Sequence, residues 1–505
     1  MGFVIPAKAG IFRRQAFARS GAAAVSDSEN AGRLIVGPFN RVEGDLEVQL
    51  DVEGGRVHAA RVNSPLFRGF ERILEGRAPL DALVIVPRIC GICSVSQSHA
   101  AATALASLAG VTPPPNGTLA ADLMLAAENA GDHLTHFHLF FMPDFARAAY
   151  AGRPWFGAVE TLFKAAAGSA VREAVEARTG LFRLFGIMGG KWPHTLTLQP
   201  GGVARALDAR DKVRLAAIIE AFRRFLETRV YGAPLEAVAE LSGLDALERW
   251  RDAGPAGLFR LFLELSADLG LDRLGRSWDR FLSYGNALQP GGIWHDGGTA
   301  PLDPGAIAED HSFARMTGRE RRHHPFDGST VPDGADETGY TWCKAPRLGG
   351  LPFETGALAR QLIGGHPLAA ALVAAGGGNV HSRVVGRLLE LARICIAMGQ
   401  WVRALDVRGD WYVDAPLPDT GAAMGLTEAA RGALGHWLRV EGGRIAHYQI
   451  IAPTTWNFSP RDSDGVAGPL EKALEGTPVQ AGERVPVAVQ HVVRSFDPCM
   501  VCTVH

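Results

Sequence analysis

Two stretches, "PRICGICSVSQSHA" (residues 87–100) and "SFDPCMVCTVH" (residues 495–505), each place two cysteines three positions apart. These four residues are Cys90, Cys93, Cys499 and Cys502. Gly91 lacks a side chain, so the backbone of the first pair can turn and let both sulfurs point one way. Four thiolates are enough to surround a soft metal centre. The two pairs are therefore candidates for one shared metal site.

Three kinds of site use paired cysteines. A structural zinc site with four cysteine ligands normally takes its pairs from within a few tens of residues, whereas most of this chain separates the two pairs. A thioredoxin-like redox pair needs a βαβ context, which neither pair has. The third possibility is a catalytic metal centre that forms where distant parts of the chain meet. The cysteines alone leave zinc and a catalytic metal equally open.

The bulk composition narrows the class of protein. The chain has 505 residues, 47% of them hydrophobic and 21% charged, which is ordinary for a globular protein with a large core. Its formal net charge of -2 argues against binding to nucleic acid or to an anionic membrane surface. No apolar run is long enough to span a bilayer. Six cysteines in such a chain do not make a disulfide scaffold, so we expect a reducing, cytoplasmic compartment.

The chain divides into an N-terminal extension and one large domain. Residues 1–31 are basic and poor in acids, and we expect them to be a disordered extension. Residues 32–505 are expected to form a single domain. In it, residues 34–62 alternate apolar and polar side chains around Gly54-Gly55, which predicts a hairpin.

Helical periodicity dominates the chain from Asp81 onward. It is strongest in residues 98–110, 118–141, 211–232 and 380–405. Residues 285–346 are rich in Gly, Pro, Asp and His and predict loops with short strands, and residues 442–453 predict a second hairpin. The expected fold is therefore α+β and mainly helical, with small antiparallel sheets near both chain ends.

Several further motifs flank the cysteine pairs in a fixed order. They are "NRVEG" (40–44), "LFRGFE" (66–71), "TWCKAPR" (341–347) and "RGALGHW" (431–437). Together with the two cysteine motifs they resemble the large, catalytic subunit of nickel–iron hydrogenases, from about Gly32 to His505. The resemblance implies that family's large-subunit fold and activity, the oxidation of H2. It also explains two thiols and an imidazole at the chain end, because that end is buried in the active site of the family.

The resemblance assigns a role to each cysteine. Cys90 and Cys499 would be terminal ligands of nickel. Cys93 and Cys502 would bridge nickel to an iron that also carries CO and cyanide. Thiolates are soft donors that suit such metals. The remaining cysteines, Cys343 and Cys395, stand alone in the sequence and are expected to be small core residues.

The resemblance also implies catalytic side chains. Glu43 matches the family's proton-transfer glutamate, which hydrogen-bonds the cysteine at the position of Cys499. A carboxylate suits this role because burial raises its pKa toward neutrality. Arg431 matches an arginine that lies over the metals and contacts a cyanide, and its permanent charge makes it a positioning group rather than a proton carrier. The family usually has proline before this arginine, whereas this chain has Ala430.

Further residues match the surroundings of the metals. Glu71, His505 and the backbone carbonyl of Ile450 match ligands of a magnesium ion, for which oxygen donors are suitable. Four more residues would surround the first ligands: Gln97, Asp132, Pro453 of "PTTWN" (453–457), and Asp497. The histidines His99, His133, His136 and His138 look like a metal site, but a packed helix explains them better.

Three features of the sequence suggest a subtype. Gln97 stands where many members carry histidine, and an amide cannot carry a proton as imidazole does. Ile92 and Phe140 stand where catalytic members often have Val and Leu along the gas channel, so bulkier side chains would slow O2 more than H2. The sequence also stops at His505 without a further C-terminal peptide. These features resemble the H2-sensing branch, with low turnover and oxygen tolerance.

Two other functions stay open from the sequence. One is an energy-conserving uptake hydrogenase, and the other is a non-catalytic scaffold subunit of a respiratory-type complex. In either hydrogenase, electrons must leave the site, and each iron–sulfur cluster needs about four cysteines. The chain has no such spare group. The resemblance therefore implies an iron–sulfur small subunit as partner and, for a sensor, a histidine kinase.

Overall fold

The computed structural model describes residues 31–505 except 255, 336 and 337. The expected extension at residues 1–31 therefore lies outside the described residues, apart from Ala31, which belongs to the first strand. None of the described helices combines enough length with enough apolar character to cross a lipid bilayer.

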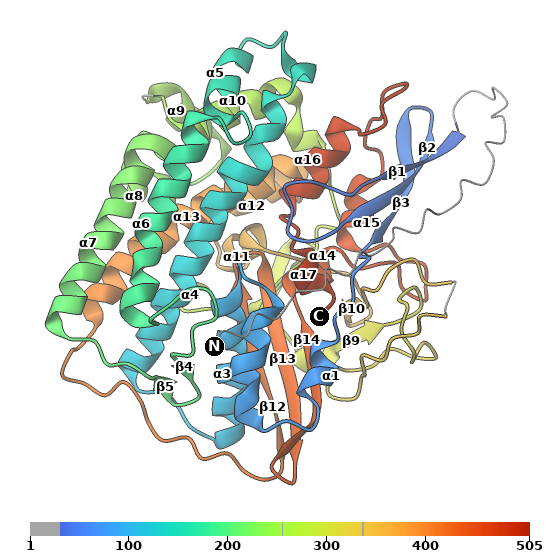
Figure 1. Ribbon diagram of the computed structural model, residues 1–505. Helices are drawn as coiled ribbons and strands as arrows, with labels where there is room; N and C mark the ends of the chain where they lie inside the picture. Colours follow the sequence, from blue (N-terminus) through green and yellow to red (C-terminus); the bar gives the residue numbers. More distant parts are fainter. Residues whose placement is uncertain (1–30, 255, 336–337) are drawn as a thin grey trace, which may run out of the picture.

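A bundle of long helices forms one side of the molecule (Figure 1). The longest are α3 (Ser94–Ala109), α4 (Pro115–Thr135), α6 (Ser169–Met188), α7 (Ala209–Phe225) and α13 (Val380–Ala404). α4 packs against α6 and α13, and α7 packs against the same two helices. α13 begins with a capping box in which the Asn379 side chain accepts from the Ser382 N–H and the Ser382 hydroxyl accepts from the Asn379 N–H. The helices predicted at residues 98–110, 118–141, 211–232 and 380–405 are confirmed by α3, α4, α7 and α13, whereas no segment was singled out at the position of α6.

Two three-stranded antiparallel sheets lie near the chain ends, as expected. The first is β1 (Ala31–Val36), β2 (Glu47–Glu53) and β3 (Arg56–Asn63), and the second is β12 (Gly421–Ala429), β13 (Gly432–Glu441) and β14 (Arg444–Ile451). The β2–β3 turn uses Gly54 and Gly55 at φ of 56° and 71°, where a side chain would cost energy. α3 packs across β12 and β13 (Figure 1).

Short elements connect these layers. The shorter helices are α1 (Phe70–Leu74), α2 (Ala82–Ile85), α5 (Phe156–Phe163), α8 (Leu235–Ala239), α9 (Leu244–Ala253), α10 (Leu258–Leu269), α11 (Ala357–Ile363), α12 (Pro367–Gly376), α14 (Pro453–Asn457), α15 (Pro469–Leu474), α16 (Val487–Ser495) and α17 (Met500–Thr503). The short strands are β4 (Leu198–Gln199), β5 (Gly202–Val203), β6 (Phe281–Ser283), β7 (Gly292–His295), β8 (Gly298–Ala300), β9 (Ile307–Asp310), β10 (Ala345–Leu348) and β11 (Glu354–Thr355). One large buried apolar cluster joins the bundle, the first sheet and the last helices, and it contains both cysteine pairs.

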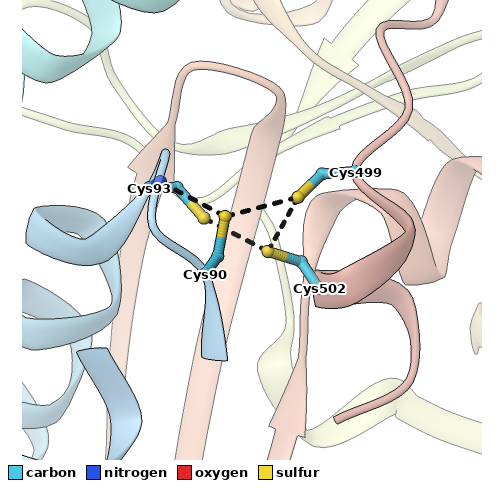
Figure 2. A group of neighbouring side chains, drawn as sticks. All are labelled: Cys90, Cys93, Cys499 and Cys502. Carbon is cyan, nitrogen blue, oxygen red and sulfur yellow. Dashed lines mark hydrogen bonds between the residues drawn. The ribbon is translucent and has the colours of Figure 1, made fainter. Parts of the chain in front are cut away.

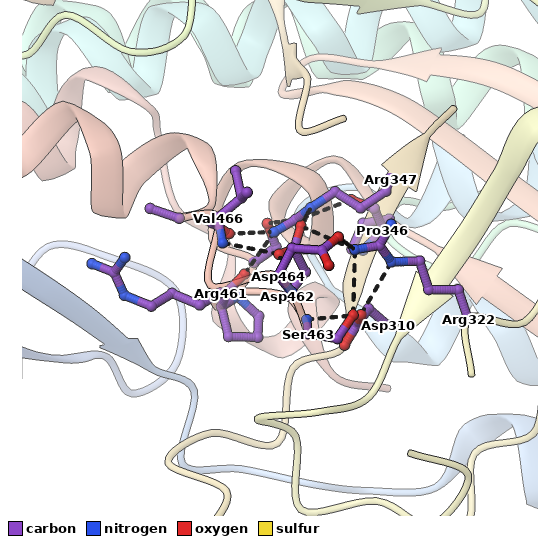
Figure 3. Close-up of polar contacts among 12 residues, drawn as sticks. Asp310, Arg322, Pro346, Arg347, Arg461, Asp462, Ser463, Asp464 and Val466 are labelled. Atoms are coloured by element: carbon purple, nitrogen blue, oxygen red, sulfur yellow. Dashed lines mark hydrogen bonds and ion pairs between the residues drawn. The ribbon is translucent and has the colours of Figure 1, made fainter. Parts of the chain in front are cut away.

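A largely buried ion-pair network joins β9, β10 and residue 322 to the segment of residues 459–466 (Figure 3). Arg347 on β10 is fully buried and donates from Nε to Asp462, 2.8 Å away. Asp310 at the end of β9 accepts from the Arg322 Nε and from the Ser463 backbone. Because each charge has a partner of opposite sign, the network holds these segments against the C-terminal part of the chain.

Candidate metal centre

The four cysteines meet although two come from each end of the chain. Cys90 precedes α3 and Cys93 is the residue before its first turn. Cys499 stands in the same way before α17, and Cys502 lies in that short helix. The sulfur atoms of Cys93 and Cys502 are 3.2 Å apart, those of Cys499 and Cys502 are 3.1 Å apart, and those of Cys90 and Cys499 are 3.5 Å apart (Figure 2). The structure thus builds the single site that the two motifs predicted.

The chemistry of these thiols fits a bound metal. All four are buried and none forms a disulfide. Hydrogen bonds from neighbouring thiols lower the pKa of Cys90, whereas the same kind of contact raises the pKa of Cys93 and burial raises the pKa of Cys502. Four thiolates at this spacing repel one another unless a cation lies among them. The donor set therefore suits soft metal ions, which bind thiolates and lower their pKa.

A carboxylate from another helix fixes the start of α3. Glu128 on α4 accepts hydrogen bonds of 2.9 Å from the backbone N–H groups of Val95 and Ser96, and one of 3.0 Å from the Trp192 indole. Burial raises the pKa of Glu128 to about 7. These bonds satisfy free N–H groups of the first helical turn, directly after Cys93. Glu128 was missed from the sequence because it lies in another helix and belongs to no motif.

Glu43 lies beside the second cysteine pair. Its backbone forms a parallel bridge with Cys499, and its carbonyl accepts a 2.7 Å hydrogen bond from the Met500 N–H. Burial raises the pKa of the Glu43 carboxyl, as does Cys90, while Arg431 and Arg68 lower it. The contact that the structure gives between Glu43 and Cys499 is one of backbones. The predicted proton-transfer role stays a prediction.

Arg431 and two acids form a buried cluster between the metal-binding segments. Arg431 follows β12 and donates to Asp132 Oδ1 at 3.0 Å and to the Asp497 carbonyl at 3.0 Å. Its Nη2 also lies 3.2 Å from the Asp497 carboxylate. Burial lowers the pKa of Arg431, but the two carboxylates outweigh it and the pKa is raised. Arg387 adds a second cation, 3.2 Å from Asp497. Arg431 is therefore permanently charged, as expected.

Arg360 holds the turn that presents Arg431. It is fully buried and donates to the carbonyls of Ala429 and Ala430, each at 2.9 Å. It also pairs with Glu428 at 2.6 Å and with Glu390. These bonds restrain the backbone at the position where the family usually has proline. Arg360 was not predicted from the sequence, because nothing in its spacing links α11 to this turn.

The three residues predicted to bind magnesium also converge. The ring Nε2 of His505 lies 3.1 Å from the Ile450 carbonyl and 4.0 Å from Glu71 Oε1. Glu71 Oε1 accepts from Thr330 and Gln449 at 3.3 Å, while its buried Oε2 has no hydrogen-bond partner. Burial raises the pKa of Glu71 to about 7. An orphaned carboxylate oxygen beside a carbonyl oxygen is suitable for a hard cation.

Gln97 takes part in a buried network rather than in a proton path. Its Oε1 lies 2.8 Å from His436 Nε2, and His436 Nδ1 lies 2.8 Å from the Tyr448 hydroxyl. Burial lowers the pKa of His436 to about 3, so the ring is neutral and links α3 to β13 and β14. His436 stands in the motif "RGALGHW", but no role was predicted for it. Pro453 begins α14, whose Thr454 hydroxyl accepts from the Cys499 N–H at 3.2 Å.

The two residues predicted to line a gas channel lie in different settings. Ile92 is partly buried against the main core, and its N–H donates to the Cys90 sulfur at 3.2 Å. Phe140 lies in a π-helical turn after α4, and its carbonyl accepts from Arg41 at 3.2 Å. Of the two residues, Ile92 contacts a thiol, whereas the hydrogen bond at Phe140 is with Arg41. Their effect on gas access stays a prediction.

The contacts of three of the other histidines and the burial of the two single cysteines agree with a structural interpretation. His133 pairs with Glu390 at 2.8 Å, and His136 and His138 bond backbone carbonyls. Cys343 and Cys395 are buried singly in different apolar clusters. Among the described residues, the side chains grouped closely enough to hold a metal are those of Cys90, Cys93, Cys499 and Cys502, and none of the residues above belongs to this group.

Comparison with known proteins places this geometry in a family. The model of the nickel-dependent hydrogenases matches residues 68–152 and 167–505. The chain is 29% identical to the periplasmic [NiFeSe] hydrogenase large subunit of Desulfomicrobium baculatum, with 96% of each chain covered. It is 26% identical to the hydrogenase-2 large chain of Escherichia coli (strain K12), covering 94% of this chain and 97% of the other.

One more relative and one solved structure agree with these matches. The quinone-reactive Ni/Fe-hydrogenase large chain of Wolinella succinogenes is 28% identical over 94% of this chain and 96% of its own length. The Ni-Fe-Se hydrogenase from D. vulgaris Hildenborough has a similar fold, with a TM-score of 0.80 and 28% identity over 94% of this chain and all of the other. None of the four names mentions H2 sensing.

Proposed function

This chain belongs to the nickel-dependent hydrogenase family, as a large subunit, and we propose that it oxidises H2 at a nickel–iron centre held by its four paired cysteines. The observation that carries the proposal is the geometry of the thiols, whose four buried sulfur atoms lie within 4.8 Å of one another. A complete set of buried soft donors from both chain ends argues against the scaffold alternative.

The cysteines divide into two pairs by position. In the proposed centre, Cys90 and Cys499 would hold nickel, and Cys93 and Cys502 would hold both nickel and an iron that carries CO and cyanide. The sulfurs of Cys93 and Cys502 lie 3.2 Å apart, which is compatible with a shared pair, but those of Cys499 and Cys502 are as close, at 3.1 Å. The division into terminal and shared ligands therefore rests on the family resemblance and not on these distances. When bound, the metal pair supplies the redox chemistry that takes up the electrons of H2.

Side chains of this chain accept the proton and provide the electrostatic environment of the site. Glu43 receives the proton on its carboxylate, since its raised pKa brings it closer to the pKa of a useful base at neutral pH. Arg431 keeps its charge and stays fixed by Asp132 and Asp497, so it orients and stabilises anionic groups over the metals. Arg360 and Glu128 act through other residues, by holding the Arg431 turn and the start of α3.

Electrons leave through another chain in this proposal. The relatives named above are large subunits or large chains, which supports pairing with a small subunit that carries iron–sulfur clusters. Cys343 and Cys395 are buried and distant in sequence from other thiols, so they do not provide a cluster site.

We further assign a magnesium ion to Glu71, His505 and the Ile450 carbonyl. The unpartnered Glu71 Oε2 supports it, because a buried carboxylate oxygen without a partner is costly. Burial also lowers the pKa of His505 well below its usual range, so the ring is neutral and able to bind a metal.

The subtype we propose is a slow, oxygen-tolerant H2 sensor that signals through a histidine kinase. Three residues support it: Gln97 in place of histidine, and the bulky Ile92 and Phe140. The names of the relatives favour the second candidate, an energy-conserving uptake hydrogenase. The two differ in turnover, in oxygen sensitivity and in the partner that co-purifies with the heterodimer.

The test is metal analysis of the purified heterodimer, with infrared detection of bound CO and cyanide, followed by H2-oxidation turnover before and after exposure to air. One nickel per large subunit with the infrared bands and H2 oxidation would support the enzyme assignment. Zinc in place of nickel would overturn it. Rapid turnover that air abolishes would overturn the sensor subtype and leave the uptake enzyme.

A further inference from the structure

A second cavity lies away from the metals and is lined by cations. Its volume is about 540 Å³, and it is lined by residues 36–41, by η4 (Met142–Ala146) and the residue after it, by residues 164–165, and by α16 with the segment before it. Four basic side chains line it, and we call it the arginine pocket: Arg41, Arg147, Lys164 and Arg494. No acidic residue is among its lining residues.

The charges around the arginine pocket do not balance. One buried carboxylate, Asp144, pairs with Arg41 and Arg494, and Arg147 lies 4.0 Å from it. His491 lies 3.9 Å from Asp144, but burial lowers its pKa to about 4, so it is neutral at pH 7. Three guanidinium groups therefore share one carboxylate. Lys164 has its own partner, Glu160, at 3.0 Å.

Two buried guanidinium nitrogens also lack acceptors. Arg147 Nη1 and Arg494 Nε have no hydrogen-bond partner, and the Arg494 side chain is only 1% exposed. The pKa of Arg494 is lowered to about 10, chiefly by burial and also by Arg41 and Arg147, against the opposing effect of Asp144. A buried donor without an acceptor is costly unless a ligand supplies one. The missing component is an anion.

We propose that the arginine pocket receives a carboxylate side chain of the iron–sulfur partner subunit. The proposal rests on the proposed function, which supplies that partner. A planar carboxylate accepts two parallel hydrogen bonds from a guanidinium, so it fits these donors. The pocket is also large enough to admit a side chain together with part of its backbone.

The surroundings favour a protein partner over other occupants. Val485 lines the pocket and is 49% exposed, and Ile35, next to the lining residue Val36, is 59% exposed. Exposed apolar side chains around an arginine cluster are typical of protein interfaces. The chain's own residues 1–30 do not suit the pocket, because Lys8, Arg13, Arg14 and Arg19 outnumber the acids Asp27 and Glu29.

The pocket is connected to the metal centre through a short piece of backbone. Arg494 Nη2 donates to the carbonyl and to the side-chain oxygen of Asn40, at 2.9 and 2.8 Å. Three residues later, the Glu43 carbonyl accepts from Met500 beside the thiols. A partner carboxylate bound here would therefore hold the backbone that carries Glu43.

The test measures affinity between the two subunits. Arg147→Glu is the main variant, because Arg147 is 36% exposed and a change there leaves the buried Asp144–Arg494 pair in place. Arg147→Lys keeps the charge, and Arg172→Glu makes the same charge change at an exposed position on α6, outside the pocket. The dissociation constant of the heterodimer is measured at several salt concentrations, on protein whose nickel and iron contents are determined first.

We expect Arg147→Glu to weaken subunit association at least about tenfold and to flatten its salt dependence, since a desolvated charge pair is replaced by repulsion. Arg147→Lys should weaken it less, and Arg172→Glu should match wild type. Equal affinity of Arg147→Glu and Arg172→Glu would overturn the proposal. So would an Arg147-dependent thermal stabilisation of the large subunit by acetate or inorganic phosphate without any change in subunit affinity. Absence of nickel in the wild type would instead overturn the proposed function. The two failures can be told apart, because metal content and subunit affinity are measured independently.

Discussion

Replacing Glu43 by glutamine tests the proton-transfer assignment most directly. The amide has nearly the shape of the carboxylate but cannot take up a proton. The backbone contacts of residue 43 with Cys499 and Met500 do not involve the side chain, so they should survive the change. The four thiols are also unchanged, and we expect nickel and iron contents equal to wild type.

The size of the effect follows from what the carboxylate supplies. A positioned general base contributes about 10²- to 10⁴-fold to rate, which corresponds to about 3–5 kcal/mol in the barrier. Glu43 is half-buried, and burial and Cys90 raise its pKa against the opposing effects of Arg431 and Arg68. The neutral glutamine keeps the position but loses this proton affinity. H2 oxidation and H/D exchange in D2O should therefore fall together by about two to four orders of magnitude per nickel.

Asp45→Asn provides the matched control. Asp45 lies two residues away on the same segment and is exposed, so the same loss of a carboxylate should leave both rates near wild type. Both rates are measured per bound nickel, which separates catalysis from metal loading. If purified Glu43→Gln with full nickel exchanges H/D within about threefold of wild type, another group carries the proton and the assignment is wrong.

Three further predictions concern the ligands, the gas path and stability. Cys499→Ser or Cys502→Ser should yield folded protein without stoichiometric nickel by metal analysis, because a hydroxyl is a hard donor; full nickel with normal H2 oxidation would contradict the ligand assignment. The double change Ile92→Val and Phe140→Leu should cost about 1–2 kcal/mol, keep the metals, and make H2 oxidation decay under air faster than in wild type; equal resistance to air would refute the narrow-channel argument. Burial raises the pKa of Glu471 from 4.5 to about 7. Between these two pH values the folded protein holds a proton at Glu471 that the unfolded chain has released, so the stabilisation from this proton is lost as pH rises through 7. Glu471→Gln should therefore flatten the fall in unfolding free energy between pH 5 and 8, by up to about 1.4 kcal/mol per pH unit in urea titrations; an unchanged slope would contradict it.

Local sequence patterns were enough to predict the secondary structure that depends on residues close together in the sequence. The hairpin at Gly54-Gly55 and the long helix α13 follow from alternation, turn residues and helical periodicity. The π-helical turn at His136–Phe141 continues a predicted helix in a geometry that periodicity does not reveal. The resemblance brought the paired cysteines together, since their own spacing left zinc open.

The residues that were missed act across long separations in sequence. Glu128 reaches the start of α3 from α4, Arg360 holds the β12–β13 turn from α11, and His436 meets Gln97 across 339 positions. Each is a buried polar group whose partner is decided by how helices and sheets pack. No period or motif relates such a residue to its partner, so only the folded structure identifies it.

The separation of the two cysteine pairs in the sequence determines how long the first pair exists before the second is synthesised. Cys90 and Cys499 lie 409 positions apart. At a synthesis rate of about 5–20 residues per second, the first pair leaves the ribosome roughly 20–80 s before the second. During that interval Cys90 and Cys93 are an incomplete two-thiol site, open to oxidants and to competing ions such as copper and zinc. A metal delivered after Cys502 has emerged meets four donors at once, so the order of synthesis favours metal binding after both cysteine pairs have been made.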